Sequence, residues 1–247
     1  MLLEACLNGA RTDAEHPAIP RTPAELAAEA AAAVAAGARV LHLHPHDDRG
    51  AETLAGDACA LAVRAVRGAC PGIPISLSTS AAIEPDPGRR IELVAGWSEL
   101  PELVTANQGE RGIVELCELL IECGVGIEAG LLSVGDAHAF VGAGIAERCA
   151  RVLIEPLDAD PDTAVTHAEA MEDVLRRAGI VLEQVHHGDG IATWSVVKRA
   201  IARGHGIRAG LEDTTVLPDG SRAADNASLV RAAAEMLRRQ APPTPAD

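Results

Sequence analysis

Residues 22–47 read TPAELAAEAAAAVAAGARVLHLHPHD and predict one helix followed by one strand. Thr22 suits the N-cap position, and Glu25, three residues later, completes a capping box of the T-x-x-E type. Gly37 favours the left-handed conformation that ends a helix, and the apolar run over 39–44 is typical of a strand. A helix that leads through a glycine turn into a strand is the unit from which parallel α/β folds are built.

The same alternation of helix and strand recurs along the whole chain. Strands are expected at 3–7, 39–44, 73–78, 102–106, 125–131, 150–155, 182–186 and 206–211. Gly124, Gly179 and Gly204 each stop a helix just before the next strand. A last helix is expected to open at Asp225 or Asn226 and to run to about residue 239.

Eight such units in about 240 residues fit a (β/α)8 TIM barrel, which typically has around 250 residues. We therefore expect residues 1–240 to form a single barrel domain and 241–247 to be a Pro-rich C-terminal tail. A doubly wound sheet is the alternative, but it usually carries G-x-G-x-x-G after its first strand, where this chain has Asn8-Gly9-Ala10-Arg11. In a barrel the chemistry lies at the carboxyl ends of the strands, so polar residues there are the functional candidates.

Composition limits the classes of function. One Phe, two Trp and no Tyr leave the core to Ala, Val, Leu and Ile. A formal net charge of −15 repels nucleic acid, and the basic residues form no cluster in the sequence. The six cysteines occur singly, which favours buried thiols in a reducing compartment. Without a signal peptide or an apolar run of roughly 20 residues, the chain is expected to be cytoplasmic and not bound to a membrane.

Two histidines stand near the end of the second expected strand. His42 and His44 are two residues apart, so both side chains project from one face, while Leu41 and Leu43 face the helices. In a barrel this face is the inner wall at the mouth, where two converging imidazoles suit a first-row metal such as zinc. Histidines that only hydrogen-bond to neighbouring loops are the alternative.

The eighth expected strand offers a third metal ligand. Arg208, Gly210 and Glu212 alternate onto one face, and Gly210 leaves space between the two charged groups. Glu212 would complete a His2Glu site with one coordination position open to a substrate. Arg208 and Asp213 are placed to form an ion pair, either within this site or as a salt bridge at the surface.

Polar residues also mark the other strands. They are Asn8 after the first, Ser78, Thr79 and Ser80 after the third, Asn107 and Gln108 after the fourth, Glu128 in the fifth, Glu155 in the sixth, and His186 and His187 after the seventh. Each alone is typical of a loop cap or of a residue that supports a ligand. Their common position at one end of a barrel predicts a single site.

Several motifs together make the chain resemble the β-keto acid cleavage enzyme family, whose described activity is 3-keto-5-aminohexanoate cleavage. The motifs are Asn8-Gly9, the H-x-H-x-x-D of 42–47, Arg208-Ala-Gly-Leu-Glu-Asp213, Leu217-Pro-Asp-Gly220 and Asn226-Ala227. The resemblance runs from Leu3 to about Val230. It implies a zinc-bearing (β/α)8 barrel that exchanges acyl groups between a β-keto acid and acetyl-CoA, releasing acetoacetate and a new acyl-CoA.

The resemblance implies a role for each matching residue. His42, His44 and Glu212 look like the ligands of one Zn²⁺ per chain. Arg208 with Asp213 looks like the dyad that removes a substrate proton, and Ser78 looks like the serine that assists it. The expected substrate contacts are Asn107, which resembles the family's strand-four position, together with Asn8, Arg11, Thr79 and His187. This chemistry needs no covalent nucleophile, which agrees with cysteines expected to lie outside the strand ends.

Three positions depart from the family's pattern. His46 stands where the family has Arg, and Arg49 is the nearby residue that could replace that charge. Ser80-Ala81 replaces a Gly-Gly pair after the third strand. Arg11 replaces the Glu that meets the substrate's amine in the aminohexanoate enzyme, so we expect a different substrate.

Arg11 has three interpretations. Pointing inward, its guanidinium would bind a second carboxylate of the substrate, as in a 3-oxo dicarboxylate. It could instead anchor a phosphate of CoA. It could also pair with Asp13 or Glu15 and face solvent.

Two rival functions stay open. A zinc hydrolase of the amidohydrolase kind also carries H-x-H, but after its first strand, and takes further histidines from strands five and six, where this chain has Glu128 and Glu155. A barrel that binds a metal or acyl-CoA without catalysis is suggested by His46 and Ser80-Ala81. The family resemblance also favours a homo-oligomer.

Overall fold

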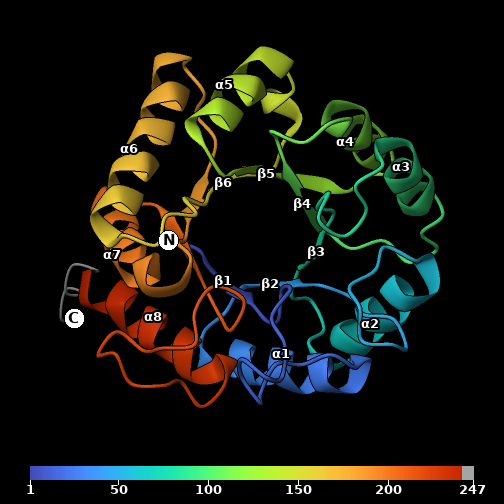
Figure 1. The fold of residues 1–247 in the computed structure, drawn as a ribbon, viewed down its shortest axis with the longest axis horizontal. Coiled ribbons are helices and arrows are strands. Elements are labelled where there is room, and N and C mark those ends of the chain that lie inside the picture. The colour runs from blue at the N-terminus through green and yellow to red at the C-terminus, as the bar shows by residue number, and fades with distance from the viewer. Residues whose placement is uncertain (241–247) are drawn as a thin grey trace, which may run out of the picture.

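Eight parallel strands close into a barrel in the order β1 to β8 in the computed structural model, which describes residues 1–240 (Figure 1). The strands are β1 Leu3–Cys6, β2 Val40–Leu43, β3 Ile75–Ser78, β4 Leu103–Asn107, β5 Gly126–Leu131, β6 Arg151–Ile154, β7 Gln184–His186 and β8 Gly206–Ala209. The predicted TIM barrel is confirmed, and every predicted strand end lies within two residues of the observed one. The tail predicted at 241–247 lies outside the described residues.

Helices surround the strands and cover the outer face of the barrel (Figure 1). They are α1 Pro23–Ala36, α2 Gly56–Ala69, α3 Pro87–Ala95, α4 Ile113–Glu122, α5 Val134–Ala143, α6 Pro161–Arg177, α7 Thr193–Arg203 and α8 Asn226–Gln240, with short 3-10 turns η1 Ala146–Arg148 and η2 Gly190–Ala192. Within residues 1–240, none of these helices is long and apolar enough to cross a membrane.

Helix α1 has the caps that its sequence predicts. Thr22 Oγ1 accepts a hydrogen bond from the Glu25 N–H at 3.2 Å, and the Glu25 carboxylate accepts one from the Thr22 N–H at 3.0 Å. Gly37 ends the helix at a φ of +126°, in the region that favours glycine, and its N–H bonds to the last turn. The chain then enters β2 with His42 and His44 in the predicted register.

The core is almost entirely aliphatic, and the two tryptophans lie at its edges. The indole of Trp97 donates to the Leu54 carbonyl at 2.9 Å, and that of Trp194 donates to the Val216 carbonyl at 2.8 Å. Both side chains are buried, and these hydrogen bonds satisfy their N–H groups.

Two expectations about the cysteines are wrong. All six are free thiols, but Cys123 is exposed rather than buried, because it caps the solvent-facing end of α4. Cys6 is the last residue of β1, so it does lie at a strand end. Its position matters for the site described below.

A buried ion cluster joins α6 to α7. Glu172 of α6 accepts hydrogen bonds from Arg199 at 2.6 Å and from Arg203 at 2.5 Å, and His205 Nε2 lies 3.3 Å from the same carboxylate. Burial would raise the pKa of Glu172, but these hydrogen bonds outweigh it and lower the pKa to about 2. The ionised carboxylate therefore stabilises the contact between the two helices.

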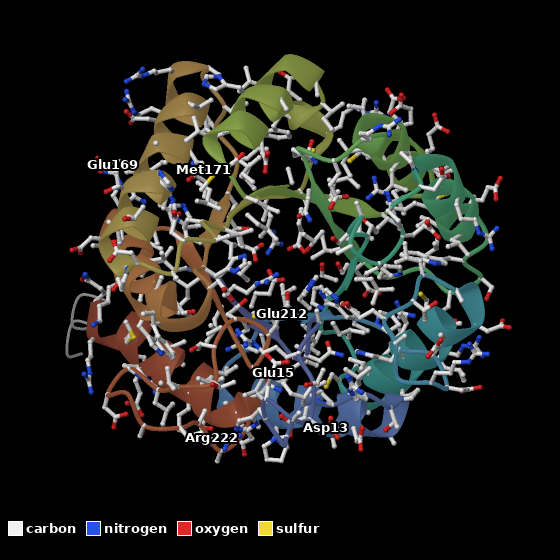
Figure 2. All side chains as sticks on the ribbon, in the orientation of Figure 1. Asp13, Glu15, Glu169, Met171, Glu212 and Arg222 are labelled. Carbon is white, nitrogen blue, oxygen red and sulfur yellow. The ribbon has the colours of Figure 1, made fainter. Side chains whose placement is uncertain are left out.

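Replacing Glu172 by Gln should lower the free energy of unfolding by about 2–3 kcal/mol at pH 7. A carboxyl whose pKa is lowered on folding contributes stability above its unfolded pKa, and this contribution is lost as the pH falls from about 4.5 toward 2. Urea unfolding across that range should therefore show the difference between wild type and variant shrinking. The control is Glu169→Gln on the exposed face of the same helix (Figure 2), which should change little. A difference independent of pH would contradict the assignment.

Candidate active site

A cavity of about 550 Å³ opens at the carboxyl ends of the strands. Every strand contributes to its wall through its last residues or the loop that follows. The polar and charged lining residues are Arg11, Glu15, His42, His44, Glu52, Ser78, Ser80, Thr105, Asn107, Glu155, Asp189, Arg208 and Glu212. Glu212 lies on the side of the ring where β1 and β2 are found when the barrel is viewed end-on (Figures 1 and 2). Of the polar strand-end residues named from the sequence, Ser78, Ser80, Asn107 and Glu155 line this cavity. The others are buried and are not among its lining residues: Asn8, Thr79, Gln108, Glu128, His186 and His187.

His42, His44 and Glu212 bring three ligand atoms together. The two Nε2 atoms are 3.1 Å apart, and Glu212 Oε1 lies 3.7 Å from that of His42 and 3.5 Å from that of His44. Ligand atoms of a tetrahedral zinc site are about 3.3–3.4 Å apart, given zinc–ligand distances near 2.0–2.1 Å. One possible ligand atom of each residue lies within 4.8 Å of the other two, a spacing at which the three residues could hold a metal ion.

Each imidazole is oriented by contacts to its other nitrogen. His42 Nδ1 lies 3.3 Å from both Ser76 Oγ and Thr105 Oγ1, and the Ser76 hydroxyl donates onward to Glu128. His44 Nδ1 contacts the Glu52 carboxylate. Both arrangements give Nδ1 a partner and leave the two Nε2 atoms facing one another and Glu212, as metal-binding histidines require.

The pKa values of these histidines follow from their neighbours. Burial lowers the pKa of His42 well below its usual value. Burial acts in the same direction on His44, but the carboxylates of Glu212 and Glu52 outweigh it and raise the pKa of His44 to about 9. His44 therefore carries a proton at neutral pH that a cation bound between these residues would displace.

The ion pair predicted between Arg208 and Asp213 is buried rather than at the surface. Arg208 Nη2 donates to Asp213 Oδ1 at 3.0 Å and to Glu212 Oε1 at 2.8 Å. The Cys6 thiol lies 2.6 Å from Asp213 Oδ2, and burial raises the pKa of that thiol well above its usual value, so it is the donor. Although burial opposes it, Arg208 and His187 lower the pKa of Asp213, which is therefore ionised.

His187 connects two carboxylates. The ring is fully buried, with Nδ1 at 3.3 Å from Asp213 Oδ1 and Nε2 at 3.4 Å from Glu155 Oε2. Glu155 lines the cavity, whereas Asp213 lies in the buried layer beside it. Burial raises the pKa of Glu155. The arrangement couples a carboxyl on the cavity wall to the carboxylate paired with Arg208.

A second pair of carboxyls lies in the barrel interior. Glu4 of β1 and Glu128 of β5 are fully buried, and Arg151 Nε lies 3.6 Å from Glu128 Oε1. Burial and the neighbouring Glu128 raise the pKa of Glu4 well above its usual value. Glu128 supports His42 through the Ser76 hydroxyl.

The predicted substrate contacts divide into two groups. Arg11 and Asn107 line the cavity, as does Ser78, the predicted assisting serine, and Asn107 donates to Glu110 at 3.0 Å. Asn8 and Thr79 are buried and bond to backbone instead: Asn8 accepts from the His44 N–H at 2.9 Å and donates to the His44 carbonyl at 2.8 Å, and Thr79 donates to the Thr105 carbonyl at 2.7 Å.

The loop after β3 is fixed by a residue that sequence reasoning missed. Glu110 accepts hydrogen bonds from the Ala81 N–H at 2.9 Å and from Ser80 Oγ at 3.3 Å, and it pairs with the buried Arg90. These contacts hold the loop where the family usually has Gly-Gly.

His46 is half-buried and its Nδ1 lies 3.0 Å from the His44 carbonyl, while Arg49 is exposed.

Other missed residues differ in whether the sequence could have identified them. Ser76 and Thr105 lie two residues before Ser78 and Asn107, so extending the period-two pattern one step down each strand would have found them. Glu52 lies in a loop without periodicity and offers no such signal. Strands β5 and β6 supply glutamates where an amidohydrolase would supply histidines, which disfavours the hydrolase alternative.

Comparison with known proteins agrees with this geometry. The family model of the beta-keto acid cleavage enzyme matches residues 1–246. The 3-keto-5-aminohexanoate cleavage enzyme of Fusobacterium nucleatum is 28% identical over 268 aligned positions, which cover 98% of this chain and 94% of that protein. The enzyme of the same name from Acetoanaerobium sticklandii is 32% identical over 136 positions, 51% of this chain and 50% of that protein.

Solved structures agree on the fold. Apo ObcA has a TM-score of 0.72 at 19% identity, with 91% of this chain and 62% of the ObcA chain covered. A ternary complex of ObcA with a C4-CoA adduct and oxalate has a TM-score of 0.74 at 19% identity, with 91% of this chain and 64% of the ObcA chain covered. This chain thus spans less than two thirds of ObcA, and the likeness concerns the barrel. Because the family model matches residues 1–246 of this chain, the chain belongs to the β-keto acid cleavage enzyme family.

Proposed function

We propose that this enzyme is a metal-dependent acyltransferase that converts a β-keto acid and acetyl-CoA into acetoacetate and a new acyl-CoA. The observation that carries the proposal is the convergence of His42, His44 and Glu212 within 3.7 Å of one another, beside the buried pair of Arg208 and Asp213. The CoA adduct bound by the structurally similar ObcA supports a CoA thioester as co-substrate.

The donor set fits a zinc ion. It combines two imidazoles, which bind zinc in their neutral form, with one carboxylate. Glu212 Oε2 is buried without a hydrogen-bond partner among residues 1–240. A zinc ion held by these three residues would stabilise the negative charge that develops on the keto and carboxylate oxygens of the acid. The fourth coordination position would remain for that acid.

Asp213 acts as the base in this proposal. Its carboxylate lies in the buried layer beside the cavity, next to Arg208 on the cavity wall, so the substrate must approach the wall at this point. There the carboxylate removes a proton from the methylene between the keto and carboxylate groups, and Arg208 keeps it ionised and oriented. The carbon that loses the proton attacks the acetyl thioester, and CoA leaves as the thiolate. The thiolate then adds to the original ketone, the bond to the methylene carbon breaks, and that carbon regains the proton from Asp213. The products are acetoacetate and the new acyl-CoA, with atoms and charges balanced.

The remaining cavity residues bind the substrate. Ser78 Oγ accepts from the Ser80 N–H at 3.4 Å, so its own proton is available for an oxygen of the acid. Asn107 also lines the cavity, and its amide N–H donates to Glu110 at 3.0 Å, which holds the side chain in place. Asn8 and Thr79 support the enzyme's backbone instead, and His187 acts through Asp213 and Glu155.

The direct test incubates the purified protein with acetyl-CoA and a panel of β-keto acids that have alkyl, hydroxyl, amino and carboxylate tails. Acetoacetate and an acyl-CoA that carries the tail of the acid should form together, in equal amounts. Release of free CoA without a new acyl-CoA would favour hydrolysis. Binding without any product would favour the non-catalytic barrel.

Replacing His44 by Ala should empty the metal site, because two remaining ligands hold zinc poorly. Zinc per chain, measured by elemental analysis after dialysis, should fall from about one to near zero. The control is His46→Ala, since His46 lies two residues on and contacts the His44 carbonyl rather than the cluster. Stoichiometric zinc in the His44 variant would rule out this ligand set.

Replacing Asp213 by Asn keeps the shape of the side chain but removes its ability to accept the substrate proton. Turnover should fall by about 10²–10⁴-fold, while zinc content stays at the wild-type value because Asp213 is not a ligand. Steady-state rates of acetoacetate formation and elemental analysis measure the two effects separately. Wild-type turnover would contradict this role and point to Glu155, the carboxyl on the cavity wall.

A further inference from the structure

The segment Gly210–Asp213 carries both a metal ligand and the base, yet it lies beyond the end of β8. The strand ends at Ala209, and the Glu212 N–H reaches the Cys6 carbonyl only at 3.4 Å. The Leu211 N–H donates to Asn226 Oδ1 at 2.8 Å. The carbonyl oxygens of Glu212 and Asp213 also accept hydrogen bonds, and the groups that donate to them help to hold the segment in place.

One side chain binds both of these carbonyls. Arg11 Nε donates to the Glu212 carbonyl at 2.9 Å, and Arg11 Nη2 donates to the Asp213 carbonyl at 3.2 Å. The Gly190 N–H also donates to the Asp213 carbonyl, at 2.7 Å. A planar guanidinium suits this task because its donors form a rigid fork that spans two neighbouring acceptors.

The outward side of the Arg11 guanidinium is also occupied. Nη1 lies 3.2 Å from Glu15 Oε1, and Nη2 lies 3.4 Å from Asp189 Oδ1. Figure 2 shows Glu15 farther from the barrel centre than Glu212, so the carboxylate lies toward the rim. Two carboxylates thus face a single positive charge at the mouth, and a second carboxylate on the substrate would meet a net negative rim.

The loop that carries Arg11 also contacts the Glu212 side chain. Gly9 has a φ of +57°, and a Cβ on it would lie 2.4 Å from Glu212 Cγ. Gly9 of the loop after β1 therefore packs against the Glu212 side chain, and Arg11 of the same loop binds the Glu212 carbonyl. Both contacts act on the same metal ligand.

We propose that Arg11 is a positioning residue that fixes Glu212 and Asp213 in their working geometry, and not a residue that binds a substrate carboxylate or a CoA phosphate. The inference rests on the proposed function, because it takes Glu212 as a metal ligand and Asp213 as the base. Residues that orient metal ligands typically change metal affinity or activity by about 10–100-fold when replaced.

Two variants of Arg11 separate these roles. Arg11→Met removes the fork and the charge, whereas Arg11→Lys keeps the charge but cannot span two carbonyls. If Arg11 positions Glu212 and Asp213, both variants should raise the zinc Kd by about 10–100-fold, as measured by competition with a chelator. The same role also predicts a similar loss of kcat with every β-keto acid whatever its tail, and an unchanged KM for acetyl-CoA.

Other outcomes overturn the inference. Wild-type zinc affinity in either folded variant, as judged by circular dichroism, would show that Arg11 does not hold Glu212. A loss confined to acids with a carboxylate tail and repaired by Lys would assign Arg11 to the substrate. A raised KM for acetyl-CoA alone would assign it to CoA.

The matched control is Glu15→Gln, which removes the charge of one of the two outer partners of Arg11 but leaves both carbonyl contacts. Its zinc affinity should stay within about twofold of the wild type, since no group that holds Glu212 is changed. Failure of the proposed function would appear in the wild type as an absence of acetoacetate. Failure of this inference would appear in the Arg11 variants as unchanged zinc affinity.

Discussion

The contact of β8 with β1 determines where the charges of the site can lie. A Cβ on Gly210 would lie 1.9 Å from the Cys6 carbonyl oxygen, so only glycine lets the end of β8 approach β1 this closely. β1 pairs with β2 on its other side, which brings Arg208 and Glu212 across β1 to the two histidines of β2. The cluster of ligand atoms therefore depends on a backbone approach between strands at opposite ends of the chain.

Burying this many ionised groups requires that each have a partner. Arg208 donates to two carboxylates, Glu52 contacts a histidine, and burial with the neighbouring Glu128 raises the pKa of Glu4, which favours its neutral form. Replacing one member leaves an uncompensated buried charge, which costs more than the contact itself contributes. The site is consequently an ordered network, and most of its members act by holding others.

The sequence predicted the parts of this network that follow strand periodicity. Alternation over 39–44 and 206–211 placed His42, His44 and Arg208 on the inner wall, because a strand fixes the direction of every second side chain. Glu212 was found by continuing the same alternation past the expected strand, although β8 itself ends at Ala209. Loop residues carry no such constraint. The contact of Glu52 with His44 and the bonds of Arg11 to two carbonyls depend on how loops from distant strands meet, and no local pattern encodes that meeting. Cys6 was misplaced for a related reason, since its role arises from Asp213, more than two hundred positions away.

The scarcity of aromatic residues makes the molecule a convenient optical system. With no Tyr, its near-ultraviolet emission comes from Trp97 and Trp194, which occupy different parts of the fold. The indole of Trp194 is bonded to the Val216 carbonyl, three residues beyond Asp213, whereas that of Trp97 is bonded to the carbonyl of Leu54, just before α2. Fluorescence of a chain that retains only Trp194 therefore reports on the loop that follows Gly210–Asp213, without any attached dye.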